Sequence, residues 1–370
     1  MTMTPIFNRN ELNIKPLSKR ISKSDKSIIM ELDAEVPAIS SRLSTQIDTL
    51  VAKVLAAKQK NAPVVLIYGA HMFRNGLSPY IIKLMELGYI NHLVTNGAGV
   101  IHDWELSYQG ETTEDVKKYL KSGQFGIWEE TGFYQNLAII LGAANSLGYG
   151  ESIGKMMDED SLIVPSWNVL QDEISTLLKD DPTCKEIPAK LTLLQTIELY
   201  LNQTECYSVK HPFKEFSLVY QAYQLGIPFS VCPGIGYDII YTHPINNGAS
   251  IGQCALQDFL YFTNTLSKIK GGVIISIGSA IMGPQITEKA LSMAKNIALQ
   301  NKKNIDDFHI NVIDIQPGDW DWSQGEPPKE HPAYFLRFCK SFSRLGGEFS
   351  YLEVDNRAFV QHLYQKLIKK

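Results

Sequence analysis

The stretch 95–105, TNGAGVIHDWE, places a histidine and two acids directly after a run of small residues. Glycines let backbone N–H groups approach a phosphate or nucleotide closely. His102 is a candidate acid or base because histidine titrates near neutral pH. Asp103 and Glu105 either line the same site or cap a helix that starts beside them. The stretch therefore predicts a bare turn at 95–99 that admits a dinucleotide, with polar side chains at its reactive end.

Other acids follow later apolar segments. Asp238 stands before an apolar pair, and His243 follows five residues on. An acid in that setting lines a site more often than it lies on a solvated face. The segment 319–322, DWDW, alternates Asp319 and Asp321 with two tryptophans. Carboxylates beside aromatic faces suit a cationic ligand such as an amine, and the alternative is a surface loop with packed tryptophans.

The histidines leave a further alternative open. His71 and His102 are either acid or base groups or satisfied polar residues. A metal-dependent enzyme would draw its ligands from carboxylates and imidazoles, here His71, His102, Asp103, Asp238 and His243. Their spacing matches no metal-ligand motif, so we expect no metal.

The elements that carry these residues alternate along the chain. Six apolar segments read as strands: APVVLIYGA, INHLVTNGAG, GIPFSV, GGVIISIGSA, FHINVIDIQ and GEFSYLEV. Helical patterns lie between and around them, at 41–59, 77–88, 133–147, 211–225, 251–269, 283–300, 331–344 and 356–368. Alternating strands and helices predict an open parallel sheet with helices on both faces. Ligands of such sheets bind beyond the carboxyl ends of the strands, where the residues above stand.

The sequence predicts a short N-terminal arm and one large domain. Residues 1–40 are polar and rich in lysine and serine, and we expect an N-terminal arm. Residues 41–370 form one α/β domain in this interpretation. The span 150–205 interrupts the alternation with two helical stretches and no clear strand, which predicts a helical insertion without a core of its own.

Composition restricts the class of protein. The chain has 370 residues, 35 Lys and Arg against 39 Asp and Glu, and a net charge of -4. This balance indicates no nucleic-acid partner, and no apolar run approaches the roughly 18 residues of a membrane span. The five cysteines never form a C-x-x-C pair, which favours reduced thiols in a cytoplasmic protein.

Six segments in this order resemble the deoxyhypusine synthase family: YGAHMFRNGLSPYI, INHLVTNGAGVIHD, GIPFSVCPGIGYDIIYTHP, GGVIISIGSAIMGPQI, VIDIQPGDWDWSQGEPP and VDNRAF. The resemblance covers about 60–365. It implies a Rossmann-like domain, NAD bound near subunit interfaces, a homotetramer, and NAD-dependent oxidation of a polyamine followed by transfer through a lysine imine. The chain is identified as a bacterial deoxyhypusine synthase-like protein rather than a true synthase.

Carried over by position, the resemblance implies that Asp238 holds the amine and that Asp319 and Asp321 face it. It also implies a cofactor-binding set: Gly69, Ala70, His71, Asn75, Gly76, Thr95, Asn96, Gly97, Ala98, Gly99, Gly278, Ser279, Ala280 and Asp355. Arg337 stands at the position of the imine-forming lysine, and arginine cannot form a Schiff base. Pro284 and Gln285 replace the family's paired histidines. The lysine-imine transfer is therefore not expected.

The segment GAGVIHDWE is also similar to the NAD-dependent archaeal-type ornithine cyclodeaminases. We therefore expect an NAD-dependent enzyme, of the transferase or the oxidoreductase and deaminase type, that acts on an amine, a polyamine or an amino-acid-derived substrate. The expected catalytic residues are His102, Asp103, Glu105, Asp238, His243, Asp319 and Asp321. The alternatives are an inactive dinucleotide-binding protein of the same fold and an ornithine-cyclodeaminase-like NAD enzyme.

Overall fold

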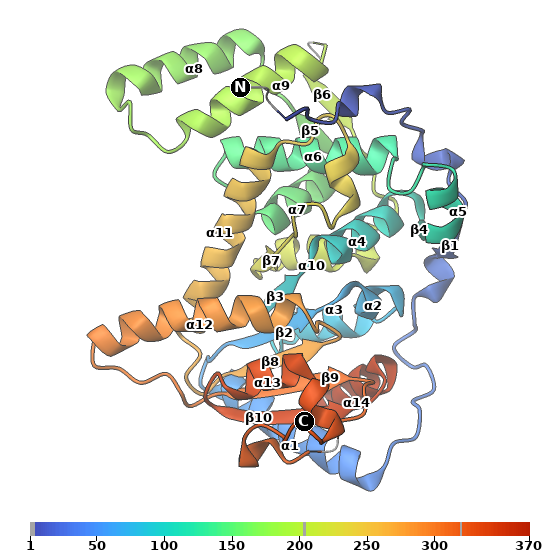
Figure 1. Cartoon of the computed structure of the whole chain (residues 1–370), viewed down its shortest axis with the longest axis vertical. Helices are drawn as coiled ribbons and strands as arrows, with labels where there is room; N and C mark the ends of the chain where they lie inside the picture. Colours follow the sequence, from blue (N-terminus) through green and yellow to red (C-terminus); the bar gives the residue numbers. More distant parts are fainter. Residues whose placement is uncertain (1–3, 203–204, 319) are drawn as a thin grey trace.

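The computed structural model describes residues 4–202, 205–318 and 320–370. Its centre is a six-stranded parallel sheet in the order β10-β9-β8-β2-β3-β7 (Figure 1). These strands are β2 (Val64–Tyr68), β3 (His92–Thr95), β7 (Phe229–Val231), β8 (Val273–Ile277), β9 (His309–Asp314) and β10 (Glu348–Glu353). All six lie in the segments that the sequence predicts to be strands.

The central strands are apolar because helices cover them on both faces. Every residue of β2, β3, β7 and β8 is buried. Successive side chains alternate between two separate cores, with Leu66 and Ile275 in one and Ile67 and Ile274 in the other. A parallel strand that is buried on both faces therefore reads as a continuous apolar run rather than an alternating one.

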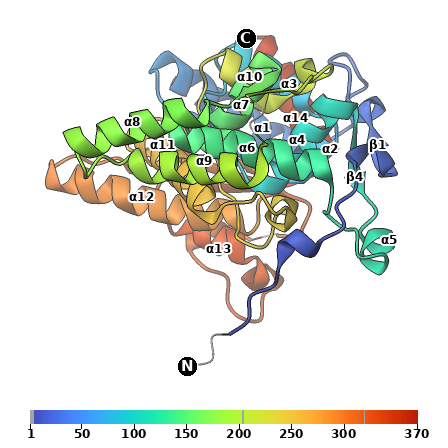
Figure 2. The ribbon, with the colours of Figure 1, turned by 90° about the horizontal axis from the view of Figure 1, so that it is seen from above.

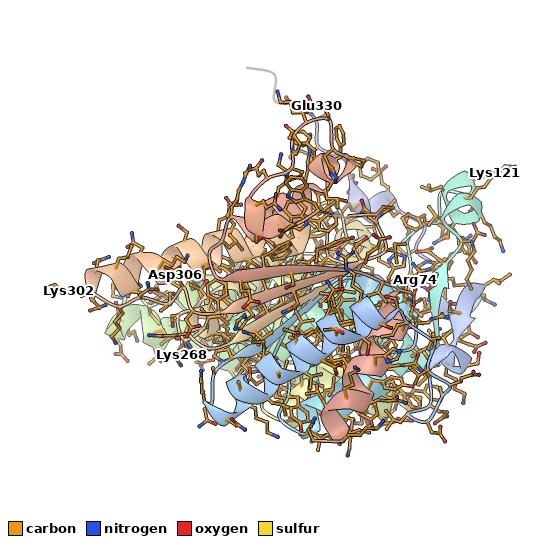
Figure 3. All side chains as sticks on the ribbon, turned by 90° about the horizontal axis from the view of Figure 1, so that it is seen from below. Arg74, Lys121, Lys268, Lys302, Asp306 and Glu330 are labelled. Carbon is orange, nitrogen blue, oxygen red and sulfur yellow. The ribbon has the colours of Figure 1, made fainter. Side chains whose placement is uncertain are left out.

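Helices on the first face include α1 (Ser41–Gln59), α3 (Ser78–Glu86) and α14 (Asn356–Ile368). The opposite face packs against α11 (Gly248–Leu266), α12 (Met282–Gln300) and α13 (Arg337–Ser343). Figure 3 shows α1 and α14 on one side of the sheet and α12 on the other. The predicted helix 41–59 is confirmed, with Ile47, Leu50, Val51 and Val54 buried as expected.

The connections between the strands give the sheet its functional edge. From β2 the chain runs outward to β3 and β7, then returns to β8 on the other side of β2 and continues to β9 and β10. This is the 3-2-1-4-5-6 order of Rossmann folds, in which ligands bind at the point where the direction reverses. The Rossmann-like α/β architecture is therefore confirmed, and its reversal point lies between the carboxyl ends of β2 and β8.

A mostly helical region stands beyond the β7 edge of the sheet. It contains α6 (Glu129–Ala144), α7 (Tyr149–Glu159), α8 (Trp167–Asp180), α9 (Ile187–Tyr200) and α10 (Leu218–Gln224). Figure 2 shows α8 and α9 side by side against α6. The span 150–205 was expected to lack strands, but β5 (Ser161–Ile163) pairs with β6 (Cys206–Ser208). These strands are only three residues long, which is why the sequence pattern missed them.

Two predicted helices are shorter than expected. The pattern 211–225 contains a 3-10 turn, η4 (Lys214–Phe216), before α10, and the pattern 331–344 contains η7 (Pro332–Phe335) before α13. Ser217 separates η4 from α10 and caps α10 through the N–H of Tyr220. Leu336 separates η7 from α13 and has a non-helical backbone conformation, with φ -74° and ψ 72°. The predicted helix 133–147 instead begins four residues earlier, as α6.

The N-terminal segment crosses the carboxyl end of the sheet. Its strand β1 (Ser22–Asp25) pairs with β4 (Glu111–Glu114), and Leu17 is buried in the first core. Arg9 donates hydrogen bonds to the carbonyl oxygens of Tyr241, His243 and Asn246. None of the helices in the described part of the chain is both long and apolar enough to cross a membrane. The predicted boundaries of the arm and the domain stay predictions.

Candidate active site

A cavity of about 510 Å³ opens beyond the carboxyl ends of β2, β3 and β7. Figure 3 shows Arg74, one of its lining residues, at the opposite end of the sheet from Lys268, Lys302 and Asp306. The lining carries both signs of charge: Arg20, Lys23, Arg74 and Lys117 against Glu105, Glu114, Asp115 and Asp238. The volume is in the range of small-molecule sites, about 300–1,000 Å³.

Helix α4 (Gly97–Gln109) forms one wall of the cavity. Asn96 caps it by accepting a hydrogen bond from the N–H of Gly99 at 3.0 Å. The predicted bare turn at 95–99 is therefore wrong, because residues from Gly97 onward are already helical. Three residues make nearly a full helical turn, so His102 and Glu105 share the cavity side of α4.

Glu105 is held by a residue of the N-terminal arm. Both of its carboxylate oxygens accept hydrogen bonds from Arg20, at 2.6 and 2.9 Å, and both side chains are buried. Thr112 and Thr131 donate to the same carboxylate at 3.0 Å each. The arm thus completes the wall of the cavity, and the fork-to-fork pairing fixes Glu105 in one orientation.

His102 lies one turn from Glu105 and is linked to it through Thr112. Its Nδ1 is 2.8 Å from the Thr112 hydroxyl. Burial is the main influence on this imidazole, and it lowers the pKa of His102 to about 4. The ring is therefore neutral at physiological pH.

Asp238 enters the cavity from the loop after β7. Its carboxylate accepts hydrogen bonds from the N–H groups of Gly234 and Ala98. A Cβ on Gly97 would lie 2.4 Å from the Asp238 carboxyl carbon, so only glycine permits this approach. Burial raises the pKa of Asp238 to about 6, because the charged form loses its hydration.

Two polar atoms at the cavity are buried without a partner among the described residues, Nε of Arg74 and Oγ1 of Thr113. Thr113 has φ 69°, a left-handed conformation that strains a β-branched residue. Unsatisfied buried donors and backbone strain are both typical of ligand sites. The sequence interpretation missed Arg20, Arg74, Thr112 and Thr113, and no local pattern singles them out.

The reversal point of the sheet adjoins this region through α2 (Ala70–Arg74), which packs against α4. The N–H of Gly69 donates to the Ile277 carbonyl, and a Cβ on Gly69 would lie 2.3 Å from the Gly278 carbonyl oxygen. Gly278 itself is exposed, with φ 58°, and no described atom lies within 4 Å of the place its Cβ would occupy. Gly69 is therefore buried against the end of β8, whereas Gly278 leaves open backbone where a dinucleotide binds in this fold.

Several predicted cofactor residues have local structural contacts. Thr95 donates to the Tyr68 carbonyl, and Ser279 accepts from the N–H of Gly283 at the start of α12. Ala280 follows in the same half-buried loop, and His71 is exposed on α2. These four residues lie at the carboxyl ends of β2, β3 and β8, as predicted.

Three further residues of the predicted cofactor set, Asn75, Gly76 and Asp355, lie near the arm and the end of β10, whereas Ala70 begins α2 and the residues 96–99 begin α4. The Gly76 carbonyl accepts from Met30 of the arm. Asn75 donates to Asn356 at 2.7 Å, and the exposed Asp355 caps α14 through the N–H of Arg357. Asp355 thus stands at the end of the edge strand β10, three strands from β2.

Asp103 faces away from the cavity. It is fully buried and accepts hydrogen bonds from the N–H groups of Leu218 and Val219, at 2.7 and 3.4 Å, where α10 begins. Burial raises the pKa of Asp103 to about 7. Its geometry matches the capping alternative, except that it caps a neighbouring helix rather than its own.

His243 and Asp321 also lie outside the cavity lining. His243 Nδ1 accepts from the N–H of Ile245, and its Nε2 is 3.5 Å from Glu129. The Asp321 carboxylate accepts three hydrogen bonds from Ser323 and Gln324, the last two residues of η6 (Trp322–Gln324), at 2.7 to 3.1 Å. Trp322 is buried in the second core, as the surface-loop alternative expected. The predicted catalytic residue Asp319 lies outside the described residues.

The five residues considered as metal ligands do not lie together at one site. Asp103 and His243 face other elements than His102 and Asp238 do. Across residues 4–202, 205–318 and 320–370, no group of three or more His, Cys, Asp or Glu side chains is arranged to hold a metal ion.

No family model matches the sequence, and no curated protein matches it. Three solved structures illustrate what the fold is similar to. A conserved LOR/SDH protein from Methanococcus maripaludis S2 has 13% identity and a TM-score of 0.42, over 92% of this chain and 74% of that chain. AgrE in ternary complex with ornithine and NAD+ has 12% identity and a TM-score of 0.45, over 90% of this chain and 34% of that chain. ArgZ, an arginine dihydrolase from the ornithine–ammonia cycle in Cyanobacteria, has 11% identity and a TM-score of 0.40, over 90% and 33%.

This chain therefore spans about a third of the length of AgrE and of ArgZ. The structures found are LOR/SDH-like, AgrE and ArgZ rather than deoxyhypusine synthases, so the predicted deoxyhypusine synthase family is wrong. The quoted segments include the carboxyl ends of parallel strands in a Rossmann order, and glycines at such ends are shared by unrelated chains of this fold. The polyamine substrate and the role given to Arg337 depended on that family and are withdrawn. The predicted homotetramer stays a prediction.

Proposed function

We propose that this protein is an NAD-dependent enzyme that oxidises an amino acid or a closely related amine. The proposal depends on one observation, which is that the dinucleotide position of the fold lies beside the charged cavity. The open backbone at Gly278, beside the buried Gly69, marks the dinucleotide position of the fold, and α2 joins that position to the charged cavity.

The residues present fit a dinucleotide. Gly278 lacks a side chain that would project into the crevice, and Gly69 lets the ends of β2 and β8 approach each other closely. Ser279 borders the crevice at the start of the loop before α12. When bound, NAD supplies the hydride acceptor for oxidation of a carbon that carries an amine. The cavity residues bind and orient the substrate and move its protons.

Two charged groups of the cavity and one neutral imidazole match the parts of an amino acid. The Asp238 carboxylate suits an ammonium group, since a buried acid gains from an opposite charge. Arg74 has an Nε donor without a partner in the described residues, which suits a carboxylate. His102 is neutral and lines the same cavity, so it can accept the proton that an ammonium group must lose before its carbon is oxidised.

The first test is ligand-dependent stability. NAD, NADP and ATP would each be added in a thermal-shift series, with no ligand as the reference. We expect NAD or NADP to stabilise the fold, by about 2.7 kcal/mol at a concentration of 100 times Kd, and ATP to have less effect. Absence of a shift with either dinucleotide would contradict the proposal.

The second test adds the amine. Calorimetry on the dinucleotide complex would use a panel that includes ornithine, arginine, lysine, alanine and spermidine, and absorbance would follow reduction of the dinucleotide. We expect amino acids with a free carboxylate to bind more tightly than spermidine, because Arg74 offers a carboxylate partner. A dinucleotide complex that binds none of them and reduces no cofactor would favour the inactive dinucleotide-binding protein.

A further inference from the structure

Thr112 lies between a candidate base and a charged acid. Its hydroxyl oxygen is 2.8 Å from Nδ1 of His102 and 3.0 Å from Oε2 of Glu105. Nε2 of His102 makes no hydrogen bond to a described residue and is not among the fully buried atoms that lack one. His102 lines the cavity, so this second nitrogen is the one open to a ligand.

Counting protons assigns the direction of each hydrogen bond. The Glu105 carboxylate is paired with the Arg20 guanidinium and can only accept. A threonine hydroxyl has one proton, and Thr112 uses it toward Glu105. The Thr112 oxygen must then accept the hydrogen bond from His102, which places the imidazole proton on Nδ1 and a lone pair on Nε2.

The surroundings keep this arrangement rigid. Glu105 is fixed by Arg20 and Thr131 as well as by Thr112. Thr112 is fully buried in β4 and is in register with Ser24 of β1. Figure 1 shows β1 and β4 together on one flank of the molecule, beside α4.

We infer that Thr112 is a positioning residue that transmits the Glu105 charge to His102 and holds its Nε2 ready to accept a proton from the substrate. The inference rests on the proposed function and deepens it. In the step, an N–H bond of the substrate ammonium breaks and Nε2–H forms. The positive charge passes from the substrate nitrogen to the imidazolium, whose Nδ1–H still points to Thr112 and through it to the Glu105 carboxylate.

Burial keeps His102 unprotonated in the free protein, with a pKa lowered to about 4, and it also opposes the imidazolium that the step forms. The charged and titratable groups that act on the ring are Glu105 on the same helix, Arg20 on the arm, and Arg74 and His71 on α2. Glu105 favours the imidazolium and the other three oppose it. The hydrogen bonds that join His102 to Glu105 through Thr112 therefore stabilise the ring most when it is protonated.

The direct test is the tautomer of His102, read by ¹⁵N NMR of histidine-labelled protein without any ligand, with His102→Gln used to assign the signal. We expect a neutral ring protonated on Nδ1 at pH 7. In free histidine the Nε2–H form is preferred, so Thr112→Val should move the proton to Nε2, while Thr112→Ser should retain it on Nδ1. A wild-type ring protonated on Nε2 would overturn the inference even if NAD and amine bind as proposed.

The kinetic test uses the same pair of variants. We expect Thr112→Val to lower kcat by about 10²-fold, the lower end of the range for general-base catalysis, because His102 itself remains, with KM little changed. Thr112→Ser should remain within about tenfold of the wild type. A Thr112→Val enzyme with unchanged kcat would contradict the positioning role. If no substrate reacts with any form of the protein, the proposed function fails, whereas the tautomer measurement still decides the role of Thr112.

Discussion

Asp103 and Glu105 stand two residues apart on α4, and both are buried, yet their carboxylates face different parts of the protein. Glu105 faces the cavity and is paired with an arginine from the arm. Asp103 faces α10, where backbone N–H groups are its partners. Two residues rotate a helix by about 200°, so neighbouring acids in a motif can belong to unrelated environments.

Glu105 and Asp103 show two ways in which the protein accommodates a buried carboxyl group. Glu105 has an opposite charge within hydrogen-bonding distance, whereas Asp103 has only dipolar donors. The pKa of Asp103 rises to about 7 because burial outweighs those hydrogen bonds. One side of α4 therefore carries a permanent ion pair suited to a reactive site, and the other carries an acid that stabilises the packing of two helices.

The largest expected effect comes from breaking the ion pair. Glu105→Leu should lower the free energy of unfolding by about 3–5 kcal/mol, because the Arg20 guanidinium would stay buried without its partner. The double variant Arg20→Met with Glu105→Leu should recover most of that loss, since neither charge remains. Urea unfolding of both variants and the wild type measures this, and a single variant within 1 kcal/mol of the wild type would show that the pair is not what holds this wall.

Asp103 should make the free energy of unfolding depend on pH. Its folded pKa of about 7 exceeds the ordinary value of 3.8, so the folded protein binds more protons than the unfolded chain between about pH 4 and 7. The Asp103 contribution to stability is therefore fully present below about pH 4 and is lost as pH rises to 7, by up to about 1.4 kcal/mol per pH unit. Asp103→Asn should flatten the decline in unfolding free energy, measured by urea titration from pH 4 to 8. A slope identical to that of the wild type would mean that Asp103 titrates normally.

On the cavity side, Asp238 should affect ligand binding. Asp238→Asn should weaken amine binding by about 1.5–3 kcal/mol, the range for hydrogen bonds to charged groups, and leave dinucleotide affinity nearly unchanged. Wild-type affinity for the amine should also fall below about pH 6, as the carboxylate becomes protonated. The control is Asp321→Asn, because Asp321 also follows a sheet strand but uses its carboxylate in its own loop. Calorimetry that finds equal losses in both variants would remove Asp238 from the binding site.

The smallest effect concerns the close contact at the start of α4. Gly97→Ala should cost about 1–3 kcal/mol of stability and weaken amine binding, because the new Cβ would displace the Asp238 carboxylate. Gly252→Ala is the matched control on α11, where no described atom lies within 4 Å of the added Cβ. That change should stabilise the protein by about 0.5–1 kcal/mol, as alanine favours helix over glycine. Thermal unfolding and calorimetry would compare the two, and a harmless Gly97→Ala would contradict the described contact.

Much of the fold was predictable because it depends on local patterns. Runs such as VVLIY and VIISI are short and rich in β-branched residues, which favours strands buried on both faces, and their alternation with amphipathic helices predicts crossover connections and a parallel sheet. The start of α4 was not predictable in the same way. Asn96 followed by three small residues reads as a turn, and the helix forms there because the Asn96 side chain caps it and Asp238 fills the space that Gly97 leaves.

The sequence by itself determined the strands, most helices and the edge of the sheet that carries the candidate site, because hydrophobic periodicity and strand ends are properties of adjacent residues. It also singled out His102, Glu105 and Asp238 as residues of the right chemical type. Only the tertiary structure decided that Glu105 pairs with Arg20, 85 residues away, and that Thr112 joins Glu105 to His102. Those contacts depend on the arm pairing with β4, and long-range pairing leaves no periodic signal in the chain.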